Sequence, residues 1–383
     1  MNPQAWLPLR RYLGVQARVD AIFDRARKRH PRLADLAYAN PYDGPTAATR
    51  EALRVALDLE HPLHLQYTPY GGRAPARRAA ALRLREIHGL PYQWGDVVLT
   101  PGAMAALAVT FRCLAERPDA RLLVVTPCWL DYPIYLENLG VTPVLVPMRR
   151  PEHDLDLEAI EVALSDERVV GLILSQPSNP TGVLFSEASL GRLGQLLGAR
   201  QQPTTLISDE AHRDYVFPPD ILRSPAAFHD RSVTIYSFGK ALLMQGQRIG
   251  YAAVSPRHPE REAMAELLRD ACRFMGVCTP TALMQHALPT LARLRPELDG
   301  FRRRREAIVD VLTRRGYAVA PGRHTFFVYA ATPGADDFAF IESLAEQGLL
   351  TLPGSLFHDP GHFRLAVTGT DEMIEQALSI LGR

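Results

Sequence analysis

One lysine of the sequence lies where an amine could be made reactive. Lys240 is part of YSFGKALLMQGQRIGY (236–251), shortly after a β-branched run, with Ser237 before it and Arg248 after it. A nearby cation lowers the pKa of a lysine, and such a lysine can form a Schiff base with a carbonyl compound. Because a lone loop lysine is more often a solvated side chain, the surrounding sequence decides between the two interpretations.

An aspartate and an asparagine also follow apolar runs, upstream of the lysine. Asp209 ends TTLISD (204–209), and Asn179 follows VVGLILS (169–175) in the segment QPSNPTG. A carboxylate, an amide and an amine that meet at strand ends are costly to desolvate unless they share a polar partner. The partner that suits all three is a pyridinium ring.

Four motifs occur in a specific order between Asn179 and Gly250. They read NPTG, then DEAH in the pattern D-E-x-(Y/H), then SFGK in the pattern S-x-x-K, and RIG in the pattern R-x-G. In this order and spacing they resemble the class I and II aminotransferases of the pyridoxal-phosphate (PLP) fold type I superfamily, and the resemblance covers nearly the whole chain. It implies PLP as the cofactor and a transferase that exchanges an amino group between an amino acid and a 2-oxo acid.

The resemblance assigns two catalytic residues. Lys240 matches the lysine that holds PLP as a Schiff base and then moves a proton between the substrate α-carbon and the cofactor, as general base and acid. Asp209 matches the carboxylate that keeps the pyridine nitrogen protonated, so that the ring accepts electrons. Asn179 matches the amide that donates to the phenolic oxygen of the ring.

The phosphate of PLP is expected at the start of a helix. TPGAMAAL (100–107) ends a strand and opens a helix, so the backbone N–H groups of Ala103 and Met104 lie where an anion is favoured. Ser237 and Arg248 match the family's phosphate ligands, which donate charge-assisted hydrogen bonds. An ordinary strand-to-helix turn is the alternative interpretation of this segment.

Two aromatic residues match family positions around the ring. Trp129, in TPCWLDY (126–132), resembles the residue that stacks on the pyridine face, although a tryptophan near a strand end is more often part of the core. Tyr67, in QYTPYGGRAPARR (66–78), resembles the tyrosine that reaches the phosphate of the neighbouring subunit. The resemblance therefore implies a homodimer with shared active sites.

Substrate contacts are expected from both ends of the chain. Arg364, in GHFRLAV, matches the arginine that binds the substrate α-carboxylate through two parallel hydrogen bonds, and Asn179 contacts the substrate as well. Asn40, in LAYANPYDGPT, lies where the family has an element over the substrate, with asparagine in place of the usual glycine. No second arginine is placed to argue for a dicarboxylate, and Tyr38 and Phe327 suit an aromatic substrate or the core equally.

His212 is the main departure from the family pattern. The commonest motif ends in a tyrosine that hydrogen-bonds the phenolic oxygen of PLP, whereas here the motif ends in histidine. An imidazole can make the same bond, but its charge depends on pH. DEAHRD also resembles PLP-dependent carbon–sulfur lyases, so β-elimination, or another PLP-dependent change to an amino acid, is the alternative function. Arg248 in QRIGY favours the aminotransferases.

The elements that must position these residues follow a βαβ rhythm. Short β-branched runs alternate with longer amphipathic runs, and the short runs are apolar throughout, which predicts strands buried on both faces of a parallel sheet. We predict a mainly parallel, seven-stranded sheet flanked by helices, in an α/β fold of fold type I. The predicted strands are 97–100, 122–126, 169–175, 204–209, 233–236 and 250–254.

A second, smaller α/β domain is expected after the sheet, where short strands mix with helices. We predict a large PLP-binding domain at 45–280, and a small domain made of 1–44 and 281–383. The run RRRRE (302–306) is interpreted as the solvated face of a helix, because acidic residues flank it.

Composition sets the remaining expectations. The chain has 383 residues and a formal net charge of +1, so we expect neither a nucleic-acid partner nor a membrane surface. Its four cysteines show no metal-binding or disulfide spacing, and no apolar run approaches the ~18 residues of a membrane span, so we expect a cytoplasmic enzyme of amino acid metabolism without a metal. A ligand-sensing regulator of the same fold is disfavoured because little sequence precedes the site-lining segment.

Overall fold

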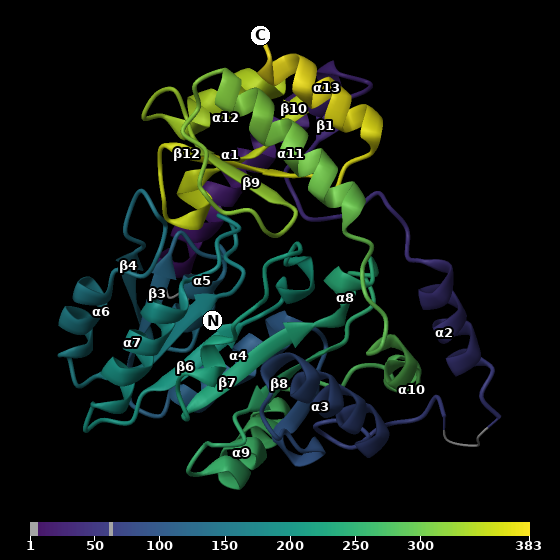
Figure 1. Ribbon diagram of the computed structural model, residues 1–383, viewed down its shortest axis with the longest axis vertical. Coiled ribbons are helices and arrows are strands. Elements are labelled where there is room, and N and C mark those ends of the chain that lie inside the picture. The colour runs from purple at the N-terminus through teal and green to yellow at the C-terminus, as the bar shows by residue number, and fades with distance from the viewer. Residues whose placement is uncertain (1–6, 61–63) are drawn as a thin grey trace.

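The computed structural model describes residues 7–60 and 64–383 and is built around a seven-stranded sheet (Figure 1). The strand order is β2-β8-β7-β6-β5-β3-β4, and all neighbours are parallel except β8, which is antiparallel to both β2 and β7. The strands are β2 (Val97–Thr100), β3 (Arg121–Thr126), β4 (Thr142–Pro147), β5 (Val169–Ser175), β6 (Thr205–Asp209), β7 (Ser232–Ser237) and β8 (Gly250–Val254). The predicted fold class is confirmed.

Six of these strands are predicted by their apolar runs, whereas β4 is not. Strands β5 to β8 are buried along almost their whole length, as expected where helices cover both faces of a sheet. β4 is the outermost strand beside β3, and it is exposed at Thr142, Leu145 and Pro147. A short, half-exposed edge strand that ends in proline lacks the continuous apolar run on which the prediction depends.

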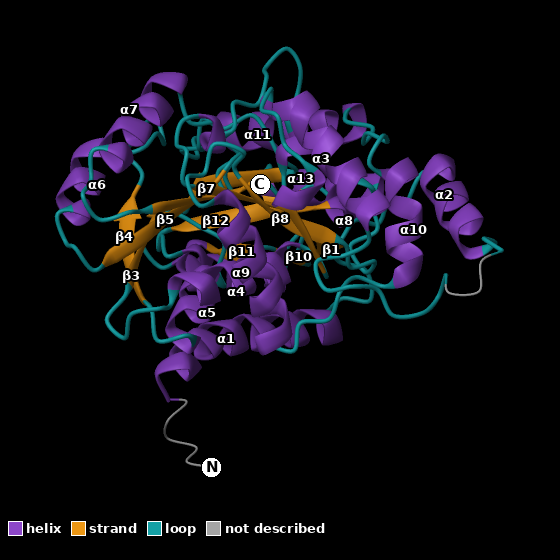
Figure 2. Ribbon diagram, turned by 90° about the horizontal axis from the view of Figure 1, so that it is seen from below, coloured by secondary structure: helices purple, strands orange, loops and turns teal. Residues whose placement is uncertain are grey.

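Helices cover both faces of the sheet (Figure 2). One face packs against α4 (Ala103–Leu114), α5 (Tyr132–Asn138) and α9 (Arg261–Phe274). The other packs against α3 (Ala74–His88), α6 (Leu157–Leu164), α7 (Glu187–Gly198) and α10 (Ala282–Leu291). Ser186 and Asp156 cap the starts of α7 and α6 by accepting backbone N–H groups, as polar cap residues do. The short helix α8 (Phe238–Ala241) follows β7, and α2 (Ala47–Leu57) packs against α10.

A second cluster of elements lies beside the carboxyl ends of the parallel strands (Figure 1). It holds the antiparallel sheet β11-β12-β9, with β9 (Phe327–Ala331), β11 (Leu352–Pro353) and β12 (His362–Ala366). A two-stranded parallel sheet joins β1 (Ala34–Asp35) to β10 (Leu349–Leu350). Around them lie α1 (Leu7–Arg29), α11 (Asp299–Arg314), α12 (Asp337–Glu346) and α13 (Asp371–Leu381), which share one hydrophobic core with these strands.

The basic run on α11 is not a solvated face throughout, so that interpretation is wrong for part of it. Arg303 is exposed, but Arg305 is buried and donates to the backbone oxygens of Phe327 and Gly322. Arg304 pairs with Asp43 and Asp371. The flanking acidic residues did not reveal this, because the partners are distant in sequence.

Within the described residues, no helix is both long enough and apolar enough to span a membrane, and no group of His, Cys, Asp and Glu side chains is arranged to hold a metal ion.

Candidate active site

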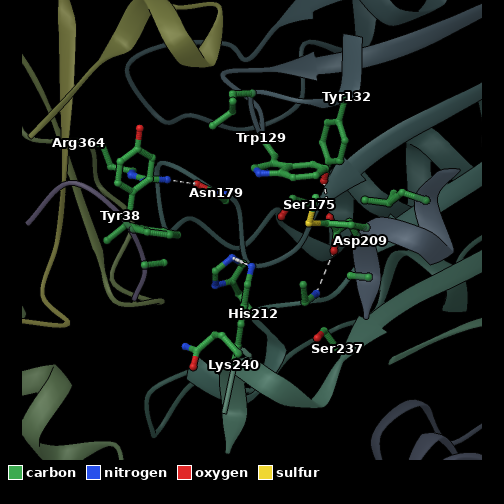
Figure 3. A pocket seen from close by; sticks show the side chains of 18 of the residues that line it. Tyr38, Trp129, Tyr132, Ser175, Asn179, Asp209, His212, Ser237, Lys240 and Arg364 are labelled. Carbon is green, nitrogen blue, oxygen red and sulfur yellow. Dashed lines mark hydrogen bonds between the residues drawn. The ribbon is translucent and has the colours of Figure 1, made fainter. Parts of the chain in front are cut away.

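A cavity of about 220 Å³ lies at the carboxyl ends of the parallel strands, facing the smaller sheet (Figure 3). This is the edge where α/β sheets bind ligands, because the loops after neighbouring parallel strands meet there. Ten of the predicted site residues line it: Ala103, Met104, Trp129, Asn179, Asp209, His212, Ser237, Lys240, Arg248 and Arg364. The other lining residues are Tyr38, Ala39, Leu107, Leu130, Tyr132, Ser175, Ala211, Gln245 and Phe327.

Lys240 extends from α8 into the cavity and meets His212. Lys240 Nζ lies 2.7 Å from His212 Nε2, so one nitrogen donates to the other. Burial, opposed by Asp209 and assisted by the cations Arg364 and Arg248, lowers the pKa of Lys240 to about 8. About a tenth of this amine is therefore neutral at pH 7, far more than of an ordinary lysine with a pKa of ~10.4, and a nucleophile or base must be neutral.

His212 is a neutral imidazole. Burial, followed by the cations Lys240 and Arg364, holds its pKa well below the usual range. Its Nδ1 is buried and has no hydrogen-bond partner within the described part of the protein, and the rings of Phe326 and Phe327 meet it edge-on at 5.2 Å. A buried nitrogen without a partner is costly, so this position is suited to a ligand.

Asp209 ends β6 and is held by two donors. Tyr132 on α5 donates its hydroxyl to Oδ2 at 2.5 Å, and the backbone N–H of Ala211 donates to Oδ1 at 3.0 Å. Burial raises the pKa of Asp209, whereas the Lys240 cation, Tyr132 and the Ala211 N–H lower it. The sequence prediction missed Tyr132, which begins α5 three residues after Trp129. Its place shortly after the end of β3, at the sheet edge where ligands bind, is the signal that could have found it.

The start of α4 forms a cradle for an anion. Gly102 has φ +84°, and a Cβ built there would lie 2.5 Å from Arg248 Nη2, so only glycine lets the guanidinium approach this backbone. Arg248 also donates from Nη1 to the Gln245 backbone oxygen at 2.6 Å. Ala103 and Met104 begin the helix, and Ser237 ends β7 beside the same cavity. Helix N–H groups, a hydroxyl and a guanidinium together suit a phosphate.

Arg364 on β12 reaches across from the smaller sheet. It donates from Nη1 to Asn179 Oδ1 at 3.0 Å and from Nη2 to the Ala37 backbone oxygen at 2.9 Å. Its guanidinium lies over the rings of Phe327 and Phe357, at 4.1 and 4.6 Å from their centroids, and its buried Nε has no hydrogen-bond partner among the residues that the structure describes. Burial lowers the pKa of Arg364 to about 9, which leaves it charged at neutral pH. It is a cation with a donor to spare for a carboxylate.

Trp129 lines the cavity between these two groups of residues. Its ring meets Tyr132 edge-on at 5.4 Å and Tyr135 at 5.6 Å, which fixes its orientation. Figure 3 shows Arg364 and Asn179 on one side of Trp129, and Tyr132 and Asp209 on the other. The indole lines the cavity, and packing against a flat ligand stays the role that the family resemblance implies for it.

Two predicted residues do not line the cavity. Tyr67 is 98% exposed, and its side chain contributes nothing to this site within one chain. Asn40 is exposed, and its neighbours Tyr38 and Ala39 line the cavity instead. Register along an irregular loop cannot be judged from spacing alone, so the prediction was off by one or two residues there.

Comparisons with known proteins find similarity along most of the chain. The model of the family "Aminotransferase class I and II" matches residues 34–381. Aspartate aminotransferase of Thermotoga maritima is 27% identical, covering 97% of this chain and 95% of its own, and a probable aspartate/prephenate aminotransferase of Aquifex aeolicus is 27% identical, covering 82% of each. Among solved structures, aspartate aminotransferase from Thermus thermophilus with maleate is 25% identical over 96% of both chains, with a TM-score of 0.85. An aminotransferase from Eubacterium rectale has a TM-score of 0.90 at 23% identity and shares the fold.

Proposed function

This chain belongs to the class I and II aminotransferases, which depend on PLP. We therefore propose that the cavity is the active site, where the enzyme moves an amino group from an amino acid to a 2-oxo acid. One observation carries the proposal: Lys240, Asp209, Arg248 and Arg364 converge on one cavity from three separate segments of the chain. The aminotransferase relatives favour transamination over the β-elimination that His212 had left open.

The residues present suit PLP. The start of α4, Ser237 and Arg248 would hold the phosphate, and Asp209 would pair with the ring nitrogen. Lys240 would hold the cofactor covalently, while His212 offers its buried Nδ1, which has no partner in the described parts of the chain. When bound, PLP supplies an electron sink and carries the amino group between the two substrates.

The chain's own residues account for binding and proton movement. Arg364 binds the substrate carboxylate and so orients the α-carbon toward the middle of the cavity. Lys240, with a pKa of about 8, takes a proton from that carbon and returns one, while neutral His212 beside it accepts or donates a hydrogen bond without adding charge. Asn179 holds Arg364 in place through its side-chain oxygen.

We also propose that the enzyme is a homodimer in which Tyr67 of one subunit reaches the site of the other. Apolar side chains are exposed together along α2 and the segment after it, a pattern typical of interaction surfaces. They are Val55, Leu57, Leu59, Leu65, Tyr67 and Tyr70. A second copy on this surface would explain why Tyr67 is almost fully exposed in one chain.

We also propose a change to the domain boundaries expected from the sequence. The first boundary stays at residue 45, and the second moves from residue 280 to the end of α10, because α10 packs against α2 and α3 of the large domain. We propose a cytoplasmic location, which the four unpaired cysteines support.

The proposed function is tested by a half-reaction. The PLP-loaded protein is mixed with single amino acids in the absence of a 2-oxo acid, and released 2-oxo acid and ammonia are measured. We expect at most one equivalent of 2-oxo acid per site, conversion of the cofactor to its amine form, and no ammonia. Sustained release of ammonia would show an eliminating or oxidising enzyme instead.

The site assignment has a control within the chain. The sequence contains two lysines, Lys240 in the cavity and Lys28 on the exposed face of α1. After reduction of the PLP-loaded protein with borohydride, mass spectrometry should find the cofactor on Lys240 and not on Lys28. Labelling of both lysines to the same extent would contradict the assignment.

A further inference from the structure

We propose that the amino donor of this enzyme is an amino acid with an uncharged, apolar side chain, rather than aspartate or glutamate. This rests on the proposed function, because it concerns the same cavity. The first observation is the distribution of charge. Among the described residues that line the cavity, the cations are Lys240, Arg248 and Arg364, and His212 is neutral.

Each of these three cations already has a task. Arg248 is packed against Gly102 at the start of α4, where the phosphate binds. Lys240 holds the cofactor, and Arg364 is tied to Asn179 and to the Ala37 backbone oxygen, where it faces the α-carboxylate. A dicarboxylic amino acid carries a second carboxylate, and no lining cation in the described structure remains for it.

The second observation is the surface beside Arg364, which we call the apolar wall and define as Tyr38, Ala39, Leu130 and Phe327. Phe327 belongs to the hydrophobic core around the smaller sheet, and Ala39 and Leu130 pack against that core. All of them line the cavity. The hydroxyl of Tyr38 accepts a hydrogen bond from Gln16 Nε2 at 2.5 Å, so its polar end is already bonded and its ring is left for the cavity.

The apolar wall and the α-carboxylate site are adjacent, so the substrate side chain lies against the wall. Figure 3 shows Tyr38 on the same side of the cavity as Arg364. A carboxylate there loses its hydration without gaining a cation, which is unfavourable, whereas an alkyl or aryl group gains by leaving water.

A neighbouring subunit does not supply the missing cation through the segment proposed to reach the site. The stretch around Tyr67, residues 55–72, contains no lysine and no arginine. The first arginine after it, Arg73, lies 2.6 Å from His286 Nε2 of its own chain, and Arg77 donates to the Val97 backbone oxygen of its own chain. The amino donor proposed for this enzyme thus differs from aspartate, the amino acid after which its relatives, the aspartate and aspartate/prephenate aminotransferases, are named.

Two unreactive carboxylates test the proposal on the PLP-loaded protein by titration calorimetry. 3-Phenylpropionate has one carboxylate and an aromatic group, and maleate has two carboxylates. We expect 3-phenylpropionate to bind at least ~10-fold more tightly, since even one methylene group changes binding in an apolar pocket by ~10-fold or more. Equal or tighter binding of maleate overturns the proposal, and so does a failure of 3-phenylpropionate to bind.

A pair of variants at Leu130 provides the second measurement. Leu130→Lys adds a cation to the apolar wall, and Leu130→Met adds similar length without charge. We expect Leu130→Lys to raise the half-reaction rate with aspartate relative to leucine by about tenfold, and Leu130→Met to leave the ratio nearly unchanged. An unchanged ratio in folded Leu130→Lys overturns the proposal. If Leu130→Lys does not fold, the calorimetry of the unmodified protein decides.

Failure of the inference and failure of the proposed function give different results. If aspartate donates its amino group faster than leucine and phenylalanine, the inference is wrong and the transaminase function stands. If no amino acid donates its amino group while 3-phenylpropionate still binds more tightly than maleate, the transaminase function is wrong and the apolar preference of the cavity stands.

Discussion

The charge of Asp209 depends on its immediate neighbours. Burial alone would raise its pKa and favour the neutral acid, which cannot pair with a protonated ring nitrogen. The Lys240 cation, the Tyr132 hydroxyl and the Ala211 N–H all favour the carboxylate. Tyr132 is therefore a positioning residue that acts on the chemistry through Asp209.

Tyr132→Phe tests this dependence. The change removes the 2.5 Å hydrogen bond to Asp209, and a hydrogen bond to a charged group contributes about 1.5–3 kcal/mol. We expect kcat/KM to fall about 10- to 100-fold and the acidic limb of its pH profile to move to higher pH, since the pKa of Asp209 rises further. Tyr135→Phe, on the same helix and also in contact with Trp129, is the control and should change neither. An unmoved acidic limb in Tyr132→Phe would argue against the assigned role.

The lowered pKa of Lys240 predicts how cofactor uptake varies with pH. Only the neutral amine attacks an aldehyde, and half of it is neutral at a pH of about 8, compared with ~10.4 for an ordinary lysine. The rate at which PLP-free protein is labelled on Lys240 should rise through this pH and level off above pH ~9. Asp209→Asn removes the carboxylate that raises this pKa, so its midpoint should move to lower pH. A rate that still climbs steeply at pH ~10 would show an unperturbed amine.

At the scale of elements, the backbone at the start of α4 is as important as the side chains. Gly102→Ala puts a Cβ against Arg248 and forces alanine into a positive-φ conformation, which costs about 1–3 kcal/mol. We expect lower stability in urea and a weakening of PLP binding by about tenfold or more. Gly89→Ala is the control, because Gly89 also has a positive φ but its Cβ would meet open space. The Gly89→Ala variant should lose stability but keep its affinity for PLP. Equal losses of PLP affinity in both variants would contradict the assignment of the phosphate site to the start of α4.

The helix α11 contacts a residue of the cavity lining through one buried arginine, Arg305, which donates to the backbone oxygen of Phe327. Arg305→Met leaves the backbone oxygens of Phe327 and Gly322 without donors, and buried groups left without partners cost about 1–3 kcal/mol each. We expect the free energy of unfolding to fall by about 3 kcal/mol, with weaker substrate binding because Phe327 lines the cavity. Arg303→Met, at an exposed position of the same helix, should change stability by less than about 0.5 kcal/mol. Similar losses of unfolding free energy in both variants would contradict the specific role of the buried Arg305.

The elements that the sequence predicts well are those whose signal is local. Strands such as β5 and β6 are continuous apolar runs, and the residues that follow them, Asn179 and Asp209, are where motifs can be recognised. β4 and the buried part of α11 are missed because an edge strand is half exposed, and because the partners of Arg305 are far away in sequence.

At the scale of the whole molecule, the site exists because two sheets face one another. Asn179 and Arg364 are 185 residues apart and meet at 3.0 Å, whereas the family resemblance implies only that both residues contact the substrate. The contact between Tyr132 and Asp209 and the apolar wall lie beyond that pattern, because they depend on how elements pack rather than on which residues follow a strand. The role proposed for Tyr67 depends on a larger scale still, that of the proposed dimer.

Mixed dimers test whether the site is shared. Lys240→Ala inactivates the chain that carries it, and Tyr67→Ala should weaken phosphate binding in the neighbouring subunit, so that at limiting PLP each variant alone has little activity. In a dimer of the two variants, one site combines both changes, and the other combines an intact Lys240 with an intact Tyr67 from the Lys240→Ala chain. Unfolding and refolding the variants together should therefore restore activity that neither has alone, and each mixed dimer should have one working site. If Tyr67 acts within its own chain, both sites of the mixed dimer are damaged and activity does not return, which would contradict the shared site.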